Sequence, residues 1–374
     1  MVLVLTLAMQ NAPTFQKSPL GPRRNMVNLD DWPKVMQIFQ EGRYRDTFMA
    51  ILNYINAEQV KKYGNEDQTH FEFRHGSTVL SVDVNDKDYT IRAPFLKLAG
   101  DKLVPFLRQI TELNFNTLVL PRLVLEDDVL TFRFASPIDG SFPYKVYDLF
   151  KNICHTADNF DDFFIDKFGV EHAQELKVEH YTDAEVDAFY EQFQSILKEA
   201  MEFVNYFEGR RLYTFGKEIL ILELQKLDYS LRPQGFLKGE IEKVIKGLKA
   251  QAPDDQKLMD QKPEVVKLQE MPKEKFAQSM YKVEVFVPEG GKMDVMGVKN
   301  YFKKTVEDAE KDLERRAYEG AYLILAGDIY SLLFYNDLPE DMYKMLVELL
   351  EAASGKSWAE ADTVLLEGLQ NLMK

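Results

Sequence analysis

The sequence contains almost no cysteine and none of the glycine patterns that mark nucleotide-binding loops. Its single cysteine, Cys154, excludes an intramolecular disulfide and a metal site built from several cysteines. The glycines form neither a phosphate-binding loop nor a dinucleotide-binding fingerprint, and there is no Gly-x-Ser-x-Gly turn. These absences remove the usual sequence signatures of nucleotide-dependent enzymes and of serine hydrolases.

Basic residues are also scarce. The chain has 46 Lys and Arg against 61 Asp and Glu, which gives a net charge of −15 and an isoelectric point near 5.0. An acidic protein repels a polyanion, so we expect no nucleic-acid partner, and the same charge suits a basic protein partner. Long hydrophobic runs are missing too, because no stretch reaches the roughly 20 apolar residues of a transmembrane helix. We therefore expect no membrane association and a cytoplasmic location.

Residues 1–28 are expected to form a tail. The first ten, MVLVLTLAMQ, are mostly apolar, but they are too short to span a bilayer and lack the basic region that precedes the apolar part of a secretory signal. Residues 10–28 contain three prolines and few periodic apolar positions, which is typical of a linker. The pattern favours a disordered tail, or translation from Met26, over a targeting role.

Hydrophobic and aromatic residues are plentiful, at 45% and 12% of the chain, so sizeable cores are expected. In residues 29–175 the spacing of apolar residues changes from helical to alternating and back. Short polar turns join the alternating segments, so an antiparallel sheet and an α+β fold are expected. The predicted elements are helices at about 30–41 and 44–62, strands at 71–73, 79–84 and 89–93, a helix at 103–113, strands at 118–125 and 129–134, and a helix at 142–168.

This order of elements resembles the YbjN family, whose members share the fold of type III secretion chaperones. The resemblance lies in the helix end LRQITELN at 107–114 and in the hairpin LVLEDDVLTFRF at 123–134. In that family a leucine-rich helix that closes on an asparagine precedes a strand, an acidic turn and a second strand. The match covers about residues 30–175 and implies an antiparallel sheet, flanked by helices, that binds protein partners. The long helical remainder is a departure from a minimal chaperone of this class.

The rest of the chain is predicted to be largely helical. Residues 176–250 form a helical region, in which the apolar run at 212–231 is compatible with a strand or a buried helix. Residues 251–275 hold three prolines and many charges and are expected to be a linker. Residues 276–374 begin with a predicted strand at 281–287 and continue as helices, so a divergent second copy of the first domain is a further hypothesis. The predicted helices are at about 295–316, 318–335, 339–353 and 357–373.

Four aspartates in one predicted helix, Asp158, Asp161, Asp162 and Asp166, are the nearest approach to a metal site. Three of them recur every four residues, so their carboxylates share one helical face, and divalent cations bind such oxygen ligands. A metal-dependent hydrolase with a carboxylate site near 158–166 is therefore the alternative function. Three phenylalanines lie among the aspartates, however, and this pattern favours an amphipathic helix with an acidic solvent-exposed face.

Other polar groups give weaker candidates. The turn at 83–88 resembles a calcium loop but lacks its central glycine and closing glutamate, so a hairpin turn is predicted. His70 and His75 lie five residues apart on a predicted strand and point to opposite faces, which makes them poor co-ligands. Cys154 and His155 are adjacent on a predicted helix and diverge, so we expect a core cysteine beside a surface histidine.

The patterns favour a non-enzymatic protein-binding module, chaperone- or adaptor-like. Its sheet and helices are expected to bind an extended segment of an unidentified protein partner, and the resemblance implies a homodimer. The candidate contact residues are the aromatic sheet positions, although each is more typical of a core: Phe71, Phe73, Phe132 and Phe134. No catalytic residue, cofactor or metal is assigned, and a structural subunit of a larger assembly is a further alternative.

Overall fold

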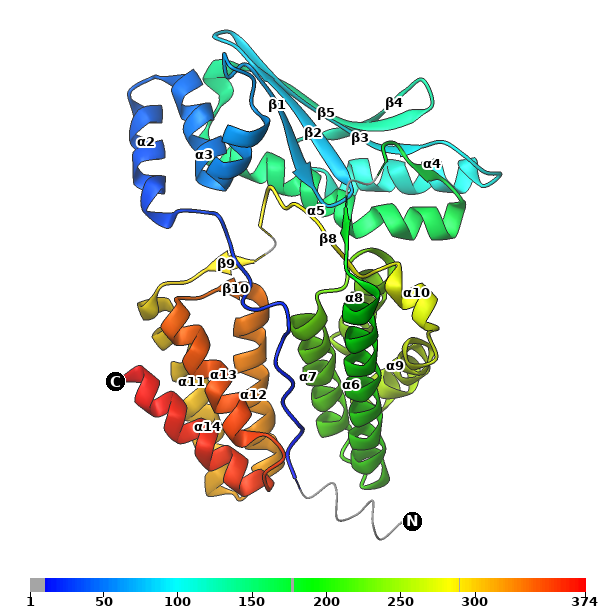
Figure 1. Ribbon diagram of the computed structural model, residues 1–374, viewed down its shortest axis with the longest axis vertical. Coiled ribbons are helices and arrows are strands. Elements are labelled where there is room, and N and C mark those ends of the chain that lie inside the picture. Colours follow the sequence, from blue (N-terminus) through cyan, green and yellow to red (C-terminus); the bar gives the residue numbers. More distant parts are fainter. Residues whose placement is uncertain (1–10, 176–177, 289) are drawn as a thin grey trace. The chain divides into compact units, whose positions relative to one another are not determined.

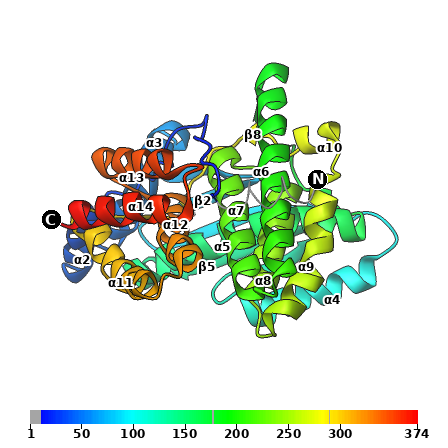
Figure 2. The same ribbon diagram turned by 90° about the horizontal axis from the view of Figure 1, so that it is seen from below.

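A computed structural model describes residues 11–175, 178–288 and 290–374, and these fall into two compact units. The α+β unit consists of Met26–His180 together with residues 281–288. The helical unit consists of residues 11–25, Tyr181–Met280 and Gly290–Lys374. Figure 1 labels the elements of both units, and Figure 2 shows them from below. Each unit therefore includes a short segment that is distant in sequence from most of its other residues.

The α+β unit is built on an antiparallel sheet with the strand order β1-β2-β3-β5-β4. Buried and accessible side chains alternate along β1 and β2, as expected for strands with one face against a core. β3 continues past Pro94, where the sequence predicts its end, because its register with β5 shifts between Pro94 and Leu96. The strands are β1 (His70–His75), β2 (Thr78–Val84), β3 (Asp88–Lys97), β4 (Arg122–Glu126), β5 (Val129–Pro137) and the short β6 (Glu171–His172), which pairs with β3.

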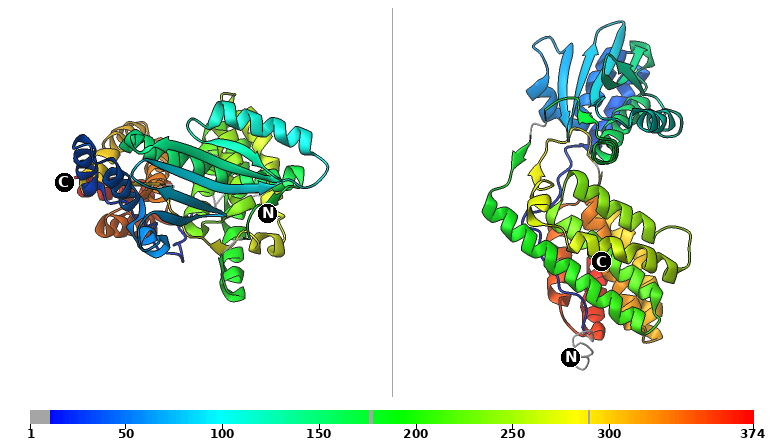
Figure 3. Two further views of the ribbon diagram at one scale, coloured as in Figure 1. Left: turned by 90° about the horizontal axis from the view of Figure 1, so that it is seen from above. Right: turned by 90° about the vertical axis from the view of Figure 1, so that its right-hand side faces the viewer.

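Helices cover the apolar face of this sheet. Phe48 of α3 and Phe150 of α5 pack their rings against Tyr89 and Phe73 of the strands, and all four side chains are buried. In the view from above in Figure 3, the strands face the viewer. The sheet and helices confirm the predicted α+β class with an antiparallel sheet flanked by helices. The helices are η1 (Leu29–Asp31), α2 (Trp32–Gln40), α3 (Tyr44–Tyr63), α4 (Leu103–Glu112), η2 (Leu113–Thr117), η3 (Ile138–Gly140) and α5 (Pro143–Phe168).

The helical unit is a set of packed helix pairs. Neighbours in sequence contact each other, α6 with α7, α8 with α9, α11 with α12 and α13 with α14, and α7 also contacts α12 (Figures 1 and 2). Every residue of 219–231 in α7 is buried, so this helix lies at the centre of the unit. The helices are α6 (Asp183–Gly209), α7 (Tyr213–Leu231), α8 (Gly235–Leu248), α9 (Asp254–Gln269), α10 (Lys273–Ala277), α11 (Val295–Glu314), α12 (Tyr318–Tyr335), α13 (Glu340–Ala353) and α14 (Trp358–Met373).

Three turns between helices share one backbone conformation. A residue with positive φ follows the first helix of each pair, and it is Gly42 at 74°, Arg211 at 60° or Arg316 at 59°. The next residue is the N-cap of the second helix, and a tyrosine occupies the first position of that helix in all three cases. A left-handed residue is a common way to end a helix. The same turn therefore joins α2 to α3, α6 to α7 and α11 to α12, although it spans too few residues to produce a clear sequence repeat.

Several predictions for the C-terminal half are wrong. The expected linker at 251–275 forms α9 and α10, because its apolar residues Leu258, Val265 and Leu268 are buried. For the run at 212–231 the sequence left a strand and a buried helix open, and the buried helix is confirmed as α7. The predicted strand at 281–287 is reduced to β8 (Tyr281–Lys282), which pairs with β7 (Glu179–His180). The remaining strands after it, β9 (Gly291–Lys292) and β10 (Asn336–Asp337), pair only with each other. A second copy of the sheet domain is thus absent from the described residues after 180.

None of the helices in the described ranges is both long enough and apolar enough to cross a lipid bilayer. α12 carries many apolar side chains, but α7, α11 and α14 pack against it.

Candidate functional site: residues 11–25 on the helical unit

Residues 11–25, here called the N-segment, lie along the helices of their own unit. The sequence predicts a tail at 1–28, and this prediction is wrong for the N-segment, while residues 1–10 lie outside the described part of the chain. The N-segment forms no helix, and its residues Ala12, Ser18 and Asn25 are only 3%, 5% and 8% exposed. It runs beside α7 and α12 in the lower part of Figure 1. An extended chain is therefore held between helices that are far away in sequence.

Main-chain groups hold the start of the N-segment at the turn between α13 and α14. The amide of Ala12 donates a hydrogen bond to the carbonyl of Lys356 at 2.7 Å. The amide of Phe15 donates to Oγ of Ser354 at 2.9 Å. Bonds of this kind recognise an extended backbone and depend little on the side chains of the bound segment.

Thr14 is the most densely bonded residue of the N-segment. Its amide and its hydroxyl both donate to the carboxylate of Glu199, at 2.9 Å for each bond to Oε1. Its carbonyl accepts a hydrogen bond from Nζ of Lys226 at 2.9 Å. One glutamate and one lysine therefore recognise the amide, the carbonyl and the hydroxyl of a single residue.

The middle of the N-segment is bonded to the C-terminal end of α7. Oγ of Ser230 donates to the carbonyl of Gln16 at 3.3 Å, and Oγ of Ser18 donates to the carbonyl of Ser230 at 2.8 Å. The guanidinium of Arg232, just after α7, donates to the carbonyl of Gly21. The bonds thus continue over most of the length of the N-segment.

A buried charge cluster lies beneath Thr14. Nζ of Lys226 is 2.7 Å from Glu199 Oε2 and 2.5 Å from Glu223 Oε2, and the side chains of Lys226 and Glu223 are fully buried. Burial lowers the pKa of Lys226, but the two carboxylates outweigh it and raise this pKa above its ordinary value. Nζ of Lys226 also donates to the carbonyl of Thr14, so the N-segment supplies one of the three oxygens that surround this ammonium group. The N-segment therefore contributes to the stabilisation of a buried cation.

The charges of the N-segment and of the helices are complementary. The N-segment contains three basic residues and no acidic residue, in a protein with a net charge of −15. Each basic side chain faces an acidic side chain of the same unit, and the pairs are Lys17 with Glu351 at 3.8 Å, Arg23 with Asp228 at 4.0 Å, and Arg24 with Asp337 at 3.5 Å. The surface that receives the N-segment is consequently suited to a basic, extended chain.

Two histidines of the α+β unit, His70 and His75, differ in burial and in hydrogen-bond partners. His70 is accessible and pairs with Asp83 at 2.7 Å, whereas His75 is fully buried with Nε2 2.8 Å from Asp158 Oδ2. The amides of Phe286 and Val287 donate to His75 Nδ1 at 3.2 and 3.3 Å. His75 therefore fastens residues 281–288 to the sheet, and it is not placed to act on a substrate.

The carboxylates of α5 do not form the predicted acidic solvent face. Asp161 is 4% exposed and bonds to the hydroxyl of Ser77, and Asp158 turns inward to His75. Burial, followed by the neighbouring carboxylates, raises the pKa of Asp161 well above its ordinary value. Asp166 remains accessible. Across the described ranges, no three His, Cys, Asp or Glu side chains are grouped so as to hold a metal ion.

The remaining sequence candidates occupy structural positions. Cys154 is buried in the core, as predicted, and Asn85 closes the β2–β3 turn by accepting hydrogen bonds from the amides of Lys87 and Asp88. The aromatic contact candidates lie in the core or partly in it, since Phe71, Phe73 and Phe132 are 0% exposed and Phe134 is partly buried.

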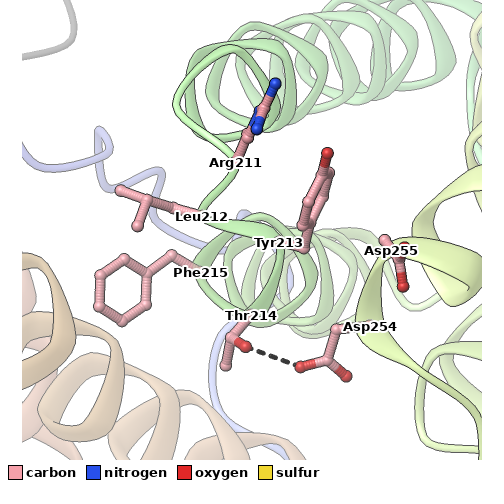
Figure 4. A pocket seen from close by; sticks show the side chains of 7 residues that line it. All are labelled: Arg211, Leu212, Tyr213, Thr214, Phe215, Asp254 and Asp255. Atoms are coloured by element: carbon pink, nitrogen blue, oxygen red, sulfur yellow. Dashed lines mark hydrogen bonds between the residues drawn. The ribbon is translucent and has the colours of Figure 1, made fainter.

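The hollow in Figure 4 lies beside the turn between α6 and α7. It has a volume of about 360 Å³ and is open to solvent, and the side chains that line it come from this turn and from the start of α9. Thr214 donates to Asp254 at 2.8 Å, and Lys217 and Lys257 lie 3.3 and 3.1 Å from the same carboxylate. The carboxylate is satisfied by these neighbours, so the hollow offers no converging set of reactive groups.

The sequence contained one signal of the N-segment site. Glu223 and Lys226 stand three residues apart inside the apolar run ILILELQKLDY, and charged residues are rarely buried without a partner. The N-segment itself gave no such signal, because main-chain bonds leave no pattern of side chains.

No model of a known protein family matches the sequence, and no curated protein is significantly similar to it.

Proposed function

We propose that this protein is a non-enzymatic protein-binding module, chaperone- or adaptor-like, whose helical unit binds an extended polypeptide segment. One observation carries the proposal: the N-segment already lies on the helices in an extended form, with main-chain bonds to Lys226, Ser354 and Lys356. The resemblance of the sequence of the α+β unit to YbjN proteins and secretion chaperones implies the same class of function.

The test is direct binding of a peptide with the sequence of the N-segment, NAPTFQKSPLGPRRN, to the full-length chain. We would use the variant Ala12→Asp, because a charge at this buried position weakens the native N-segment and leaves the helices unchanged. Fluorescence anisotropy of the labelled peptide should show saturable binding, and a peptide of the same composition in shuffled order is the control. Equal binding of the two peptides, or no binding to a variant that circular dichroism shows to be folded, would refute the proposal.

We also propose that the α+β unit forms a homodimer. Strand β4 is at the end of the strand order, and exposed apolar side chains lie on it or within seven residues before it in the chain, namely Phe115, Val119, Val124 and Leu125. Exposed apolar side chains grouped beside a sheet edge are typical of a protein interface. Light scattering after size exclusion should give the mass of a dimer, and Phe115→Asp should give a monomer. A monomeric mass for the unsubstituted chain would refute this part of the proposal.

A further inference from the structure

We infer that the N-segment is an internal competitor, which occupies the polypeptide site until a partner segment displaces it. This inference rests on the proposed function and adds two things to it, the chemistry of the partner and the way in which access is controlled. The partner is an extended, proline-containing, basic segment with a small apolar residue followed two positions later by a threonine or serine. Each of these features corresponds to a contact that the N-segment makes.

The required chemistry follows from three places in the site. At Ala12 the bound residue is 3% exposed, so only a small side chain fits there. At Thr14 the carboxylate of Glu199 accepts hydrogen bonds from both the amide and the hydroxyl, so a valine in place of threonine leaves the carboxylate one bond short. Pro13, between them, is buried and has no amide proton that needs a partner.

The N-segment has the features of an exchangeable ligand. Its side chains are only partly buried: Ala12, Pro13, Ser18 and Asn25 are buried, whereas Thr14 and Lys17 are exposed and Phe15 and Gln16 are half-buried. Its attachment is mostly polar, through the main chain and through three ion pairs, of which Lys17–Glu351 is exposed while Arg23 and Arg24 reach the buried carboxylates of Asp228 and Asp337. A partner with the same backbone geometry can make all of these bonds, so exchange loses little free energy.

The covalent connection makes the N-segment a strong competitor. Asn25 continues directly into Met26, so the N-segment cannot diffuse away, and its effective concentration at the site is on the order of millimolar. If the N-segment itself has an intrinsic dissociation constant of about 10 μM, a competing peptide binds the native chain on the order of 100-fold more weakly than it binds an open chain. Only a partner segment that binds tightly therefore displaces the N-segment, and a weakly binding segment does not.

The experiment compares three full-length chains with the labelled N-segment peptide. The native chain is the reference, and Ala12→Asp is the opened chain. The locked chain is Asn11→Cys with Ser357→Cys, because these two residues form an antiparallel bridge, and paired positions of this kind have Cα atoms about 4.5–5.5 Å apart, within the range of a disulfide. Cys154 is buried and does not compete in the oxidation. The reduced locked chain is the matched control for the oxidised one.

We expect the opened chain to bind the peptide 10- to 100-fold more tightly than the native chain. The oxidised locked chain should not bind measurably, and reduction should restore the native affinity. In a second series, the opened chain should bind a peptide with Val at the position of Thr14 at least 3-fold more weakly, and a peptide with Ser there with unchanged affinity. Loss of this preference would overturn the proposed partner chemistry.

The outcomes separate this inference from the proposed function. Equal affinity of the native, opened and oxidised locked chains would overturn the inference and leave polypeptide binding in place, at another site. Binding by none of the chains would overturn the proposed function itself. If Ala12→Asp does not fold, the comparison of the oxidised and reduced locked chains still decides, since equal binding by these two forms overturns the inference.

Discussion

The two units each hold a segment from elsewhere in the chain, and they hold it in different ways. The α+β unit holds residues 281–288 through its core: the rings of Phe286 and Phe73 stack with centroids 4.0 Å apart, and Phe286 and Val287 are fully buried. The helical unit holds the N-segment mainly through hydrogen bonds to its main chain, several of them from partly or fully buried groups such as Lys226. Apolar burial makes a segment part of a core, whereas main-chain hydrogen bonds can be made equally by another extended segment.

The two units would lose different interactions if their inserted segments were removed. Without residues 281–288, His75 would lose both of the amides that donate to its Nδ1, and a large apolar cavity would form beside Phe73. Without the N-segment, Lys226 would lose one of its three partners but keep both carboxylates. The first unit should therefore depend on its inserted segment for stability, and the second should tolerate the loss. The chain offers a way to observe them separately, since Trp32 belongs to the α+β unit and Trp358 to the helical unit, and there are no other tryptophans.

Removing the aromatic anchor should have the largest effect. Phe286→Ala should lower the free energy of unfolding of the α+β unit by about 3–5 kcal/mol, because it deletes a fully buried ring and leaves a cavity. Urea unfolding followed by Trp32 fluorescence, in a chain with Trp358→Phe, measures this change. The adjacent Val285→Ala is the matched control, and it should cost less than about 1 kcal/mol because Val285 is 37% exposed. If Phe286→Ala and Val285→Ala had equally small effects on stability, residues 281–288 would not be part of the core.

Removing the buried cation should have the next largest effect. Lys226→Met should destabilise the helical unit by about 3 kcal/mol, since it leaves two buried or half-buried carboxylates without a positive partner. Unfolding followed by Trp358 fluorescence, with Trp32→Phe, gives the value. Adding Glu223→Gln should recover part of the loss, and a double variant no more stable than Lys226→Met alone would contradict the role assigned to the charge pair.

A change in the N-segment itself should have a smaller effect. Thr14→Val removes the hydroxyl that donates to Glu199, so the bound N-segment should weaken by about 1 kcal/mol, which corresponds to roughly 5-fold tighter binding of the competing peptide. Thr14→Ser keeps the hydroxyl and should bind the peptide as the native chain does. A similar change in both variants would show that the hydroxyl is not recognised.

A further effect concerns pH and involves neither inserted segment. Burial raises the pKa of Asp362 in α14 to about 8, and neither of its carboxylate oxygens has a hydrogen-bond partner among the described residues. Between about pH 4 and about pH 8 the folded chain keeps the proton on Asp362 that the unfolded chain loses. The stability that depends on this proton is therefore fully present below about pH 4 and is lost as the pH rises to about 8.

Asp362→Asn should therefore match the native chain in stability near pH 4 and be the more stable of the two at pH 8.5. Thermal unfolding at the two pH values measures the difference. Glu367→Gln, at an exposed position of the same helix, should show no such dependence on pH. A difference in thermal stability between Asp362→Asn and the native chain that stays constant across this pH range would contradict the raised pKa of Asp362.

The sequence predicted the α+β unit well and the helical unit less well, for physical reasons. Strands with one face against a core alternate strictly, as 79–84 do, and their pattern survives in the sequence. The centre of the helical unit is α7, which is buried on every side and so has no amphipathic period to detect. Residues 281–287 alternate like a strand, yet only Tyr281–Lys282 pair, because the chain bends to bury the consecutive Phe286 and Val287.

The candidate site was the hardest part to predict. The N-segment is rich in proline and polar residues, which is the composition of a free tail, and its bonds are made largely by its backbone. The pairing of Glu223 and Lys226 within α7 was visible, but Glu199 of α6 and Thr14 join them only in the folded chain. Tertiary contacts of this kind have no local signature.

Native-state hydrogen exchange tests most directly whether the two inserted segments differ as described. Amides of Ala12, Thr14 and Phe15 should exchange by local opening, with free energies at least about 2 kcal/mol below those of α7 in the same unit. Amides of Phe286 and Val287 should exchange only when β1 and β2 do, because they belong to that core. Protection of the N-segment equal to that of α7 would contradict the account, since it would make residues 11–25 as permanent a part of their unit as residues 281–288 are of theirs.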